Sequence, residues 1–548
     1  MESKPWFQHY DPGIDLLCTY TTMLPKEQFL FWVNKQPERP YIYYLDDIIT
    51  YNQANILACK LARQLQSIGM KKGDRLVLTL PNIPEFIIAV QACFKIGVIV
   101  VPTNPRYTER ELAYRYANSG AKIAMCLAQH VDTLLELQKE KCPDLQNVIV
   151  VAGEQEKRSL AQIKGLFFYN QFLKSDDCDE PQEEGSLEDV AVLIYTGGTT
   201  GVSKGCSITN ANLNAVALGW KQMSQYFTDF SRYKVLCCTP MYHIHGFQIA
   251  INSNILLGGS VVILSGLTPE EIIKAINRYE PNVLPVVPTL IRELMKRQDF
   301  AESKAHLIEH IGCGASPIPA AIMKEFENII GVPIIEGYGA SETTMAVSGN
   351  PMRKRKTGSV GLPYPQTDVK IVDIETGQKE LPAGQIGELC FKGPQVIKEY
   401  WNNPKETKLA IKEGWWYSGD IGYMDEEGFL FLIDRKKDII NCSGFNVFSN
   451  EVDEVLNSHP KILEAGVVGI PDHKRGETVK AYVVKHPGED LSKEEIKNFC
   501  RKYLTAYKVP REIEFIDVLP RTCVYKVDRK KLKLMNQQKR DQKSQEEK

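Results

Sequence analysis

Apolar residues recur along the first part of the chain in two alternating patterns. Short apolar runs predict buried strands at 73–80, 98–103, 121–126 and 191–194. Between them, apolar positions at helical spacing predict helices over 52–68 and 83–96 and a further helix from Thr108. Strands that alternate with helices of about 10–15 residues are typical of parallel sheets built from βαβ units. We therefore expect an α/β fold.

The alternation resumes further along the chain and then changes character. The second group of predicted elements comprises strands at 235–240, 260–264 and 283–287 and helices at 246–257, 269–279 and 288–297. From Thr367 onward, short alternating runs predict a β-rich subdomain at about 350–434. Residues 176–189 are acidic and polar, which favours an exposed linker, and residues 533–548 are nearly all polar or charged, which favours a disordered tail.

Composition narrows the class of protein. A chain of 548 residues is too long for one core. The 66 basic and 68 acidic residues nearly balance, so no nucleic-acid footprint is expected. None of the 14 cysteines stands at Cys-x-x-Cys spacing, which argues against zinc ribbons and favours reduced thiols. We find no secretory signal, peroxisomal signal or apolar run long enough for a membrane span, so a cytoplasmic location is expected.

The segment Tyr195-Thr-Gly-Gly-Thr-Thr-Gly-Val-Ser-Lys-Gly205 carries the strongest chemical signal. It follows an apolar run and precedes a helical pattern for which Thr209 is a plausible N-cap, so we expect a strand, a loop and then a helix. Glycines let a backbone approach an anion, hydroxyls donate hydrogen bonds, and Lys204 adds a positive charge. The spacing does not match the common nucleotide loop. A plain Gly/Thr hairpin turn is the alternative interpretation.

The segment resembles the signature loop of the adenylate-forming superfamily, which includes acyl-CoA synthetases, firefly luciferase and peptide-synthetase adenylation domains. In that pattern proline stands where this chain has Ser203, a change expected to loosen the loop slightly. Six motifs in the family's order cover about residues 25–532. The resemblance implies that ATP is bound by Thr196, Gly197, Gly198, Thr199, Thr200 and Lys204, with Thr199 also near Mg²⁺.

Two further glycine-rich motifs belong to the resemblance. In Glu336-Gly-Tyr-Gly-Ala-Ser-Glu342, Tyr338 would stack on adenine, Ser341 would contact the α-phosphate, and Glu342 would be catalytic and hold Mg²⁺. The resemblance also places Glu336, Gly337 and Gly339 in the nucleotide site. Gly312-Cys-Gly-Ala-Ser316 would border the adenine through Gly314, Ala315 and Ser316.

Histidines invite two interpretations. By resemblance, His243 lines the acid pocket and takes part in catalysis, Phe247 gates an acyl tunnel, and Gly312 and Gly337 complete this pocket. A metal-binding pair in Tyr242-His-Ile-His-Gly-Phe247 is the alternative interpretation.

His306 and His310 match an inverted zinc-protease spacing. We reject a zinc site there, because no third ligand is apparent, and expect surface histidines on a helix.

The C-terminal motifs complete the set. Asp420 would bind the ribose hydroxyls with Arg435 close by, and Lys437 occupies the family's hinge position. The turn at Ser443, Gly444 and Phe445 would face the thiol substrate. Lys526 matches the catalytic lysine, although Val524-Tyr525 replaces the family's Ser-Gly and predicts a stiffer loop.

The resemblance implies a large N-terminal domain, residues 1–434, of two α/β sheets plus the β-rich subdomain. A small, mobile α+β domain, residues 435–532, would follow, with the active site at the junction. The expected reaction is ATP-dependent: a carboxylic acid becomes acyl-AMP, pyrophosphate leaves, and CoA accepts the acyl group. ATP, Mg²⁺ and coenzyme A are thus the expected cofactors.

Several alternatives stay open. A medium- or long-chain fatty acid is the favoured substrate, and an aromatic or alicyclic carboxylate fits the same residues. An enzyme that loads a carrier protein would be indifferent to CoA. A nucleotide-binding protein with impaired catalysis is a further alternative, if the change before Lys526 disables it. The state could be a monomer or a homodimer.

Overall fold

The computed structural model describes residues 4–18, 21–160, 162–163, 165–196, 203–226, 228–314, 318, 320–443, 445–521 and 527–546. The chain divides into two compact units. The first comprises residues 1–369, 391–417 and 427–429, and the second comprises residues 370–390, 418–426 and 430–548. These units do not follow a single cut in the sequence, and a domain boundary at 434/435 stays a prediction.

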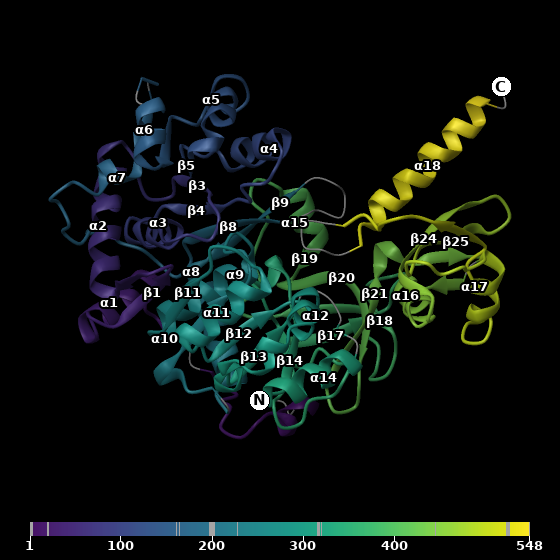
Figure 1. The fold of residues 1–548 in the computed structure, drawn as a ribbon. Coiled ribbons are helices and arrows are strands. Elements are labelled where there is room, and N and C mark those ends of the chain that lie inside the picture. The colour runs from purple at the N-terminus through teal and green to yellow at the C-terminus, as the bar shows by residue number, and fades with distance from the viewer. Residues whose placement is uncertain are drawn as a thin grey trace. The chain divides into compact units, whose positions relative to one another are not determined.

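One sheet of the first unit has seven strands, and Figure 1 labels most of them. Their order is β7 (Leu166–Phe168), β6 (Asn147–Val151), β5 (Ile123–Leu127), β3 (Arg75–Thr79), β4 (Ile99–Pro102), β8 (Val190–Thr196) and β9 (Lys204–Thr209). Neighbours are parallel except β8 and β9, which form an antiparallel hairpin. The associated helices are α2 (Tyr51–Ser67), α3 (Pro84–Lys95), α4 (Glu109–Ser119), α5 (Val131–Glu140), α6 (Glu154–Leu160), α7 (Tyr169–Phe172) and α8 (Asn210–Ser224).

The second sheet of the first unit has nine strands. Their order is β16 (Leu362–Pro363), β15 (Ser348–Gly349), β14 (Ile334–Tyr338), β13 (His310–Cys313), β12 (Val283–Val286), β10 (Lys234–Cys237), β11 (Ser260–Ile263), β1 (Pro40–Tyr44) and β2 (Asp47–Thr50). The central six run parallel, and β2, β15 and β16 add antiparallel edges. Its helices include α1 (Pro25–Lys35), α9 (Ile244–Phe247), η4 (Gln248–Asn252), α10 (Ser253–Leu257), α11 (Pro269–Tyr279), α12 (Pro288–Met295), α13 (Gln298–Ala301) and α14 (Ala320–Ile330).

These elements confirm the α/β class and most of the predicted periodicity. The amphipathic helix α11 begins and ends at the predicted residues. Thr268 caps its start and accepts a hydrogen bond from the backbone N–H of Glu271, and Glu280 follows its end with a left-handed φ of 51°. One large core contains residues from both sheets, including Leu76, Val192 and Val235. Apolar burial therefore holds the two sheets together in one unit.

The predicted order of strand, loop and helix around the Gly/Thr segment was wrong. Strand β9 lies between the loop and α8, so the segment connects the two arms of a hairpin. β9 is buried along most of its length, including Cys206 and Ile208, but its sequence Lys-Gly-Cys-Ser-Ile-Thr contains no apolar run that would predict a strand. Thr209 is nevertheless the N-cap of α8 and accepts from the backbone N–H of Asn212.

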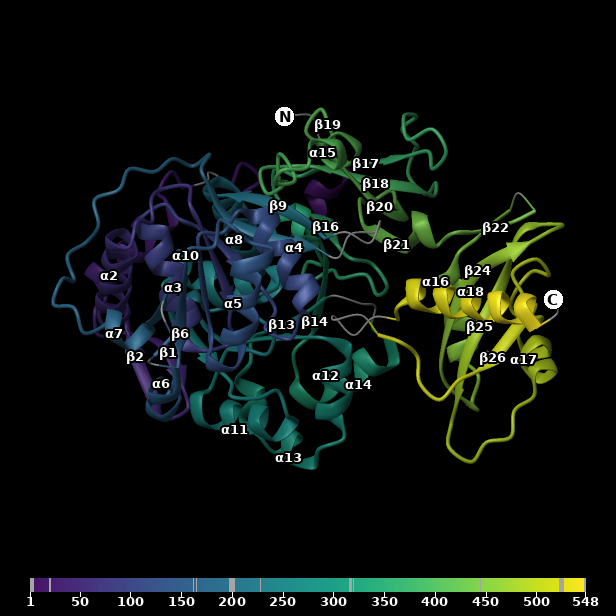
Figure 2. The same ribbon diagram turned by 90° about the horizontal axis from the view of Figure 1, so that it is seen from above.

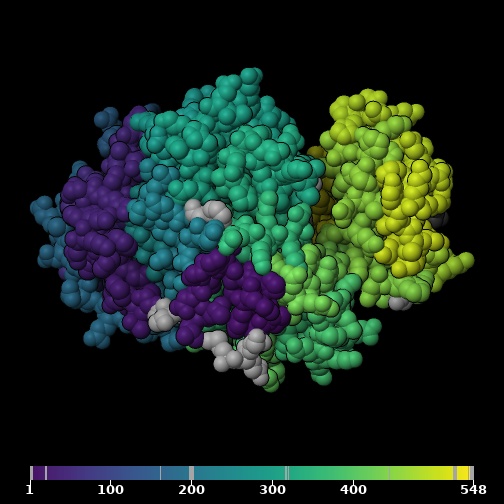
Figure 3. All heavy atoms as spheres, turned by 90° about the horizontal axis from the view of Figure 1, so that it is seen from below, coloured from purple at the N-terminus to yellow at the C-terminus, as the bar shows by residue number. Residues whose placement is uncertain are grey.

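The N-terminal segment packs against later residues of the same first unit, and Figure 3 shows it in purple against teal residues. Tyr10 donates a hydrogen bond to the carbonyl of Pro363, and Asp11 accepts one from the backbone of Met352. The same unit contains α15 (Pro404–Ala410) and β19 (Ile411–Lys412). Segments distant in the sequence thus combine in this unit.

The second unit contains the greater part of the remaining strands. Strands β17 (Asp368–Val372), β18 (Gly387–Lys392), β20 (Trp415–Met424) and β21 (Leu430–Arg435) belong to one five-stranded sheet with β19. The other five-stranded sheet consists of β22 (Ile440–Cys442), β23 (Phe445–Val447), β24 (Ile462–Asp472), β25 (Gly476–Lys485) and β26 (Glu512–Phe515). Its helices are α16 (Ser449–Asn457), α17 (Lys493–Cys500) and α18 (Arg529–Glu546).

The C-terminal tail differs from its sequence prediction. Residues expected to be disordered form most of α18, which lies along β24 (Figure 2). Leu532 is fully buried in a cluster with Val468 and Tyr482, and Asn536 accepts a hydrogen bond from Lys480. Because the helix is anchored on its first turns, its polar continuation can propagate without a new nucleus.

Within the described residues, none of the helices combines the length and apolar character needed to cross a bilayer.

Candidate functional site

Two motif residues of the first unit meet at Tyr400. Its hydroxyl donates to Oε1 of Glu342 over 2.7 Å, and the ammonium of Lys204 lies 4.5 Å from its ring centroid. Lys204 also pairs with Glu406 of α15 at 3.2 Å. Burial, together with the charge of Glu342, raises the pKa of the Tyr400 phenol far above its usual range. Tyr400 therefore remains a hydrogen-bond donor to the carboxylate.

The Tyr338 motif occupies the end of β14 and the turn after it. Tyr338 is largely buried, and its ring lies 5.5 Å from that of Phe391. A Cβ at Gly339 would come within 1.9 Å of the Met345 carbonyl, so this close approach requires glycine. Ser341 and Glu342 begin the short helix η6 (Ser341–Thr343). The motif thus presents the Glu342 side chain from a tightly packed turn.

Glu336 is the most perturbed carboxyl group among the motif residues. It lies on β14, and desolvation raises its pKa to about 7, with the charge of Arg355 acting in the opposite direction. Gly337 follows it on the same strand, where a Cβ would lie 2.9 Å from the Ser348 carbonyl. Gly337 is fixed by the pairing of β14 with β15, and Glu336 by the pairing of β14 with β13.

The two signature loops are described only at their ends. Thr196 ends β8 and pairs with Lys204 in β9, whereas Gly197, Gly198, Thr199 and Thr200 lie outside the described residues. Gly312 lies in β13 and Gly314 follows that strand, whereas Ala315 and Ser316 lie outside the described residues. The structure therefore positions the arms that hold these loops.

Ser203, which stands where the family pattern has proline, makes two hydrogen bonds at the base of the hairpin, and the expected loosening of the loop stays a prediction. Its hydroxyl donates to the Thr196 carbonyl over 2.5 Å and accepts from Nη2 of Arg115 over 3.1 Å. The serine therefore ties the two arms of the hairpin together where they end.

The histidine segment begins α9. His243 is its N-cap, and burial lowers the pKa of its imidazole to about 4, with the positive charge of Arg115 adding to the effect. Desolvation likewise lowers the pKa of the His245 imidazole to about 4, with the charge of His243 adding to the effect. Phe247 is fully buried in the core. Both imidazoles are therefore neutral at neutral pH.

The pair His306 and His310 does not lie on one helix. His306 belongs to the 3₁₀ turn η5 (Lys304–Leu307), and His310 starts strand β13. His310 is buried with its ring 5.4 Å from that of Trp220, so the expectation of two surface residues was wrong for it. Among the described residues, no group of three or more His, Cys, Asp or Glu is arranged to hold a metal ion.

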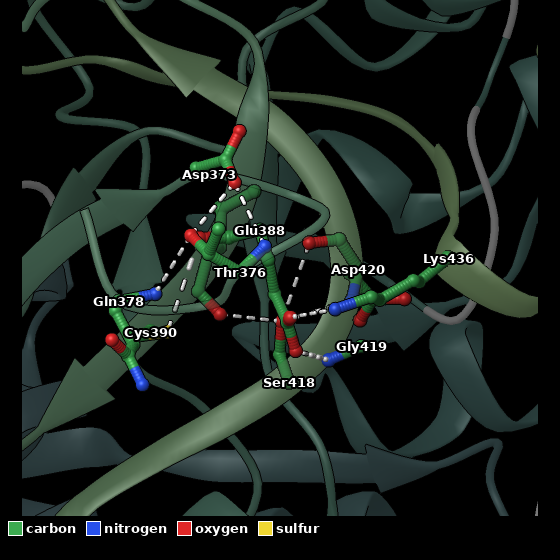
Figure 4. Close-up of polar contacts among 10 residues, drawn as sticks. Asp373, Thr376, Gln378, Glu388, Cys390, Ser418, Gly419, Asp420 and Lys436 are labelled. Carbon is green, nitrogen blue, oxygen red and sulfur yellow. Dashed lines mark hydrogen bonds and ion pairs between the residues drawn. The ribbon is translucent and has the colours of Figure 1, made fainter. Parts of the chain in front are cut away.

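A polar network in the second unit surrounds Asp420 (Figure 4). Asp420 pairs with Arg435 at 2.9 Å across strands β20 and β21. The buried carboxylate of Glu388 in β18 accepts from the backbone N–H of Gly419 over 3.1 Å and pairs with Lys436 at 2.8 Å. Glu388 thereby links the residue before Asp420 to the residue after Arg435.

The remaining motif residues of the second unit lie along the chain after β21. Partial desolvation lowers the pKa of Lys437, which lies in the turn η7 (Lys436–Asp438). Ser443 adopts a φ of 57° in the turn between β22 and β23. Phe445 is exposed and stacks on Tyr507 at 4.9 Å. Gly444 and Lys526 lie outside the described residues.

The sequence reading missed Tyr400, Glu406, Arg115 and Glu388. None of these residues belongs to one of the family motifs. The role of each becomes apparent only from the residue that it contacts in the folded structure. Glu388 lies in the predicted β-rich subdomain, and a charged residue beside the apolar run Leu389-Cys-Phe391 is the signal that could have found it.

Comparison with known proteins identifies the family of the chain. A model of the AMP-binding enzyme family matches residues 29–401, and a model of the AMP-binding enzyme C-terminal domain matches residues 451–526. The chain is 34% identical to the long-chain-fatty-acid–CoA ligase of Bacillus subtilis, over 96% of this chain and 97% of that protein.

Two solved structures illustrate the similarity of fold. ATP-bound MatB from Rhodopseudomonas palustris matches with a TM-score of 0.85 and 27% identity, over 94% of this chain and 99% of that one. The o-succinylbenzoate CoA synthetase of Bacillus subtilis, in complex with ATP and magnesium ion, matches with a TM-score of 0.77 and 27% identity, over 92% and 99% of the two chains. The motif geometry, the family models and these relatives together show that the chain belongs to the AMP-binding enzyme family.

Proposed function

We propose that this protein is an AMP-forming acyl-CoA ligase whose substrate is a long-chain fatty acid. The observation that carries the proposal is the assembly of Lys204 and Glu342 around Tyr400, which joins two motifs of the family across the fold. Lys204 and Glu342 both contact the buried phenol of Tyr400. A site for a nucleoside triphosphate needs such a pair, a cation for the phosphates and a carboxylate for the metal ion. The similarity to a long-chain-fatty-acid–CoA ligase supports the choice of acid.

In the first half-reaction, a carboxylate oxygen attacks the α-phosphate of ATP and pyrophosphate leaves. Two anions must approach each other, so the site has to offset their repulsion. Lys204 would provide a positive charge against the phosphates, and Ser341 would donate to the α-phosphate. The neutral imidazole of His243 would border the acid without adding charge.

Glu342 fits the role of a magnesium ligand. Tyr400 orients one carboxylate oxygen, and the other has no hydrogen-bond partner among the described residues. A carboxylate oxygen is the ligand type that Mg²⁺ prefers beside phosphates. The ion would neutralise charge on the triphosphate, with Glu342 and Thr199 as its proposed protein ligands.

The second unit would bind the ribose through Asp420. An ionised carboxylate can accept from two hydroxyl groups, and Arg435 keeps it oriented from the adjacent strand. Lys526 would stabilise charge during adenylation. A rotation about Lys437 would then bring Ser443, Gly444 and Phe445 to the thiol of CoA, which takes the acyl group and releases AMP.

The proposal is tested by pyrophosphate release with Mg-ATP across a panel of acids, each with and without CoA. The panel runs from acetate through hexanoate and palmitate to benzoate and cyclohexanecarboxylate. We expect the fastest CoA-dependent turnover with palmitate. A preference for benzoate or cyclohexanecarboxylate would show that the substrate is an aromatic or alicyclic carboxylate and not a fatty acid. Turnover that does not depend on CoA would indicate another thiol acceptor. If the protein binds ATP but turns over none of the acids, the alternative of a nucleotide-binding protein with impaired catalysis would be supported.

Lys526→Ala separates the two half-reactions. We expect acyl-AMP formation to fall by ~10²–10³, as when preorganised charge stabilisation is removed. Thioester formation from supplied acyl-AMP should persist. Equal losses in both steps would contradict the proposed role of Lys526.

A further inference from the structure

One face of α4 supports the base of the β8/β9 hairpin. Asn118 accepts a hydrogen bond from the Tyr195 hydroxyl over 2.7 Å, and Arg115 donates to Ser203 over 3.1 Å. Residues three apart lie on the same face of a helix. Both arms of the hairpin are therefore contacted from this one helix, by Asn118 on the β8 side and by Arg115 at the residue before β9.

Arg115 is a buried cation whose contacts among the described residues are with polar and aromatic groups. The residue is only 6% exposed, and it forms no ion pair with a carboxylate within the described residues. Its Nη1 donates to the Glu111 carbonyl of its own helix, and its guanidinium lies 3.9 Å from the Tyr107 ring centroid. A buried cation that lacks an acid needs a polar or aromatic substitute, and these contacts provide it. Its Nη2 donates to Ser203.

Ser203 passes this contact on to the opposite arm. A hydroxyl has one hydrogen and two lone pairs, so it can accept from Arg115 while it donates to the Thr196 carbonyl. Thr196 pairs with Lys204 in the ladder, and Lys204 is the residue next to Ser203. The chain of contacts therefore ends at the two motif residues that close the hairpin.

We propose that Arg115 is a positioning residue for adenylation, which acts through Ser203 to fix the end of the hairpin and thereby Thr196 and Lys204. This inference rests on the proposed ligase function. A proline at position 203 would stiffen the end of the hairpin by fixing φ. In this chain the hydrogen bond between Arg115 and Ser203 takes that role. Arg115 itself need not touch the substrate.

The test uses the full-length protein and ATP–pyrophosphate exchange in the presence of the best acid. Arg115→Gln and Ser203→Ala are each expected to raise KM for ATP about tenfold, the loss that follows removal of one hydrogen bond to a charged group. KM for the acid and the rate of thioester formation from supplied acyl-AMP should change less than twofold. Arg110→Gln, an exposed arginine on the same helix, is the matched control.

Double variants decide whether Arg115 acts through Ser203. Arg115→Gln combined with Ser203→Ala should be no worse than the poorer single variant. In a Ser203→Pro background, Arg115→Gln should raise KM for ATP less than twofold, because proline fixes the backbone without the hydroxyl.

If Arg115→Gln raises KM for ATP by the same factor in the Ser203→Ala or the Ser203→Pro background as in the wild type, the proposal is overturned, because Arg115 would then act independently of Ser203. If Arg115→Gln fails to fold, the change in KM for ATP caused by Ser203→Ala still decides, and an unchanged KM overturns the proposal. A wild-type protein without exchange would instead refute the ligase function itself.

Discussion

The hydroxyl of Tyr400 donates to Glu342 over 2.7 Å, although the two residues are 58 positions apart in the sequence. The contact fixes the carboxylate that we propose as a magnesium ligand.

Tyr400→Phe removes this donor and keeps the ring beside Lys204. We expect about a tenfold loss in kcat/KM for Mg-ATP, because the Glu342 carboxylate loses its orienting hydrogen bond. Initial rates over a Mg-ATP series measure it. Tyr423→Phe, whose ring stacks on Phe431 in β20 and β21, provides the control. An unchanged dependence on Mg-ATP would mean that Glu342 needs no orientation from Tyr400.

Glu406 and Lys204 should have opposite effects on nucleotide binding. Lys204→Met removes a positive charge and should weaken ATP binding by about tenfold or more. Glu406→Gln removes the carboxylate 3.2 Å from that ammonium and should strengthen ATP binding a few-fold, because Lys204 no longer has a competing partner. Equilibrium titration with ATP measures both. Weaker binding in both variants would show that the ion pair orients Lys204 for ATP.

Glu388 should matter for ATP without contacting it. Glu388→Gln keeps an acceptor for the Gly419 N–H and loses the ion pair with Lys436, so we expect a rise of about twofold to threefold in KM for ATP. Glu388→Ala loses both contacts and should raise KM about tenfold. Steady-state kinetics distinguish the two variants. Equal effects would indicate that the charge of Glu388, and not its contact with Gly419, orients Asp420.

Buried histidines should make the protein sensitive to acid. Burial lowers the pKa of His310 to about 4, whereas the unfolded chain keeps an ordinary value of about 6.5. The unfolded state therefore binds a proton at a higher pH than the folded state does. The free energy of unfolding falls as pH is lowered from about 6.5 through about 4, by on the order of 3 kcal/mol. His310→Phe should reduce the fall in Tm between about pH 7 and about pH 5, with His306→Phe as control. An equal fall in wild type and His310→Phe would contradict this.

Helix α18 should contribute to the stability of the second unit. Leu532 is fully buried, whereas Leu534 is 48% exposed two residues later. Leu532→Ala should destabilise the unit by about 2–5 kcal/mol through lost burial and a cavity, and Leu534→Ala by less than about 1 kcal/mol. Denaturant unfolding of the full-length protein measures both. Similar small effects would show that α18 is not packed in solution.

The fold class and many helices could be predicted because their local patterns agree with the global structure. α11 shows this agreement, with Thr268 as its cap and a clear apolar face. The β8/β9 hairpin could not be predicted, since the short strand β9 is stabilised by pairing with β8 and by burial of Cys206 and Ile208. The helical tail depends in the same way on the pocket that receives Leu532.

Sequence alone determined which residue types stand in the motifs, because glycine spacing, hydroxyls and charged residues leave a local pattern that identifies the family. Tertiary structure decided which partners those residues have. Tyr400 beside Glu342, Arg115 beside Ser203 and Glu388 beside Gly419 all join segments that are far apart along the chain. Such pairs carry no local signal, because a side chain's orientation and electrostatic environment are set by packing between distant elements.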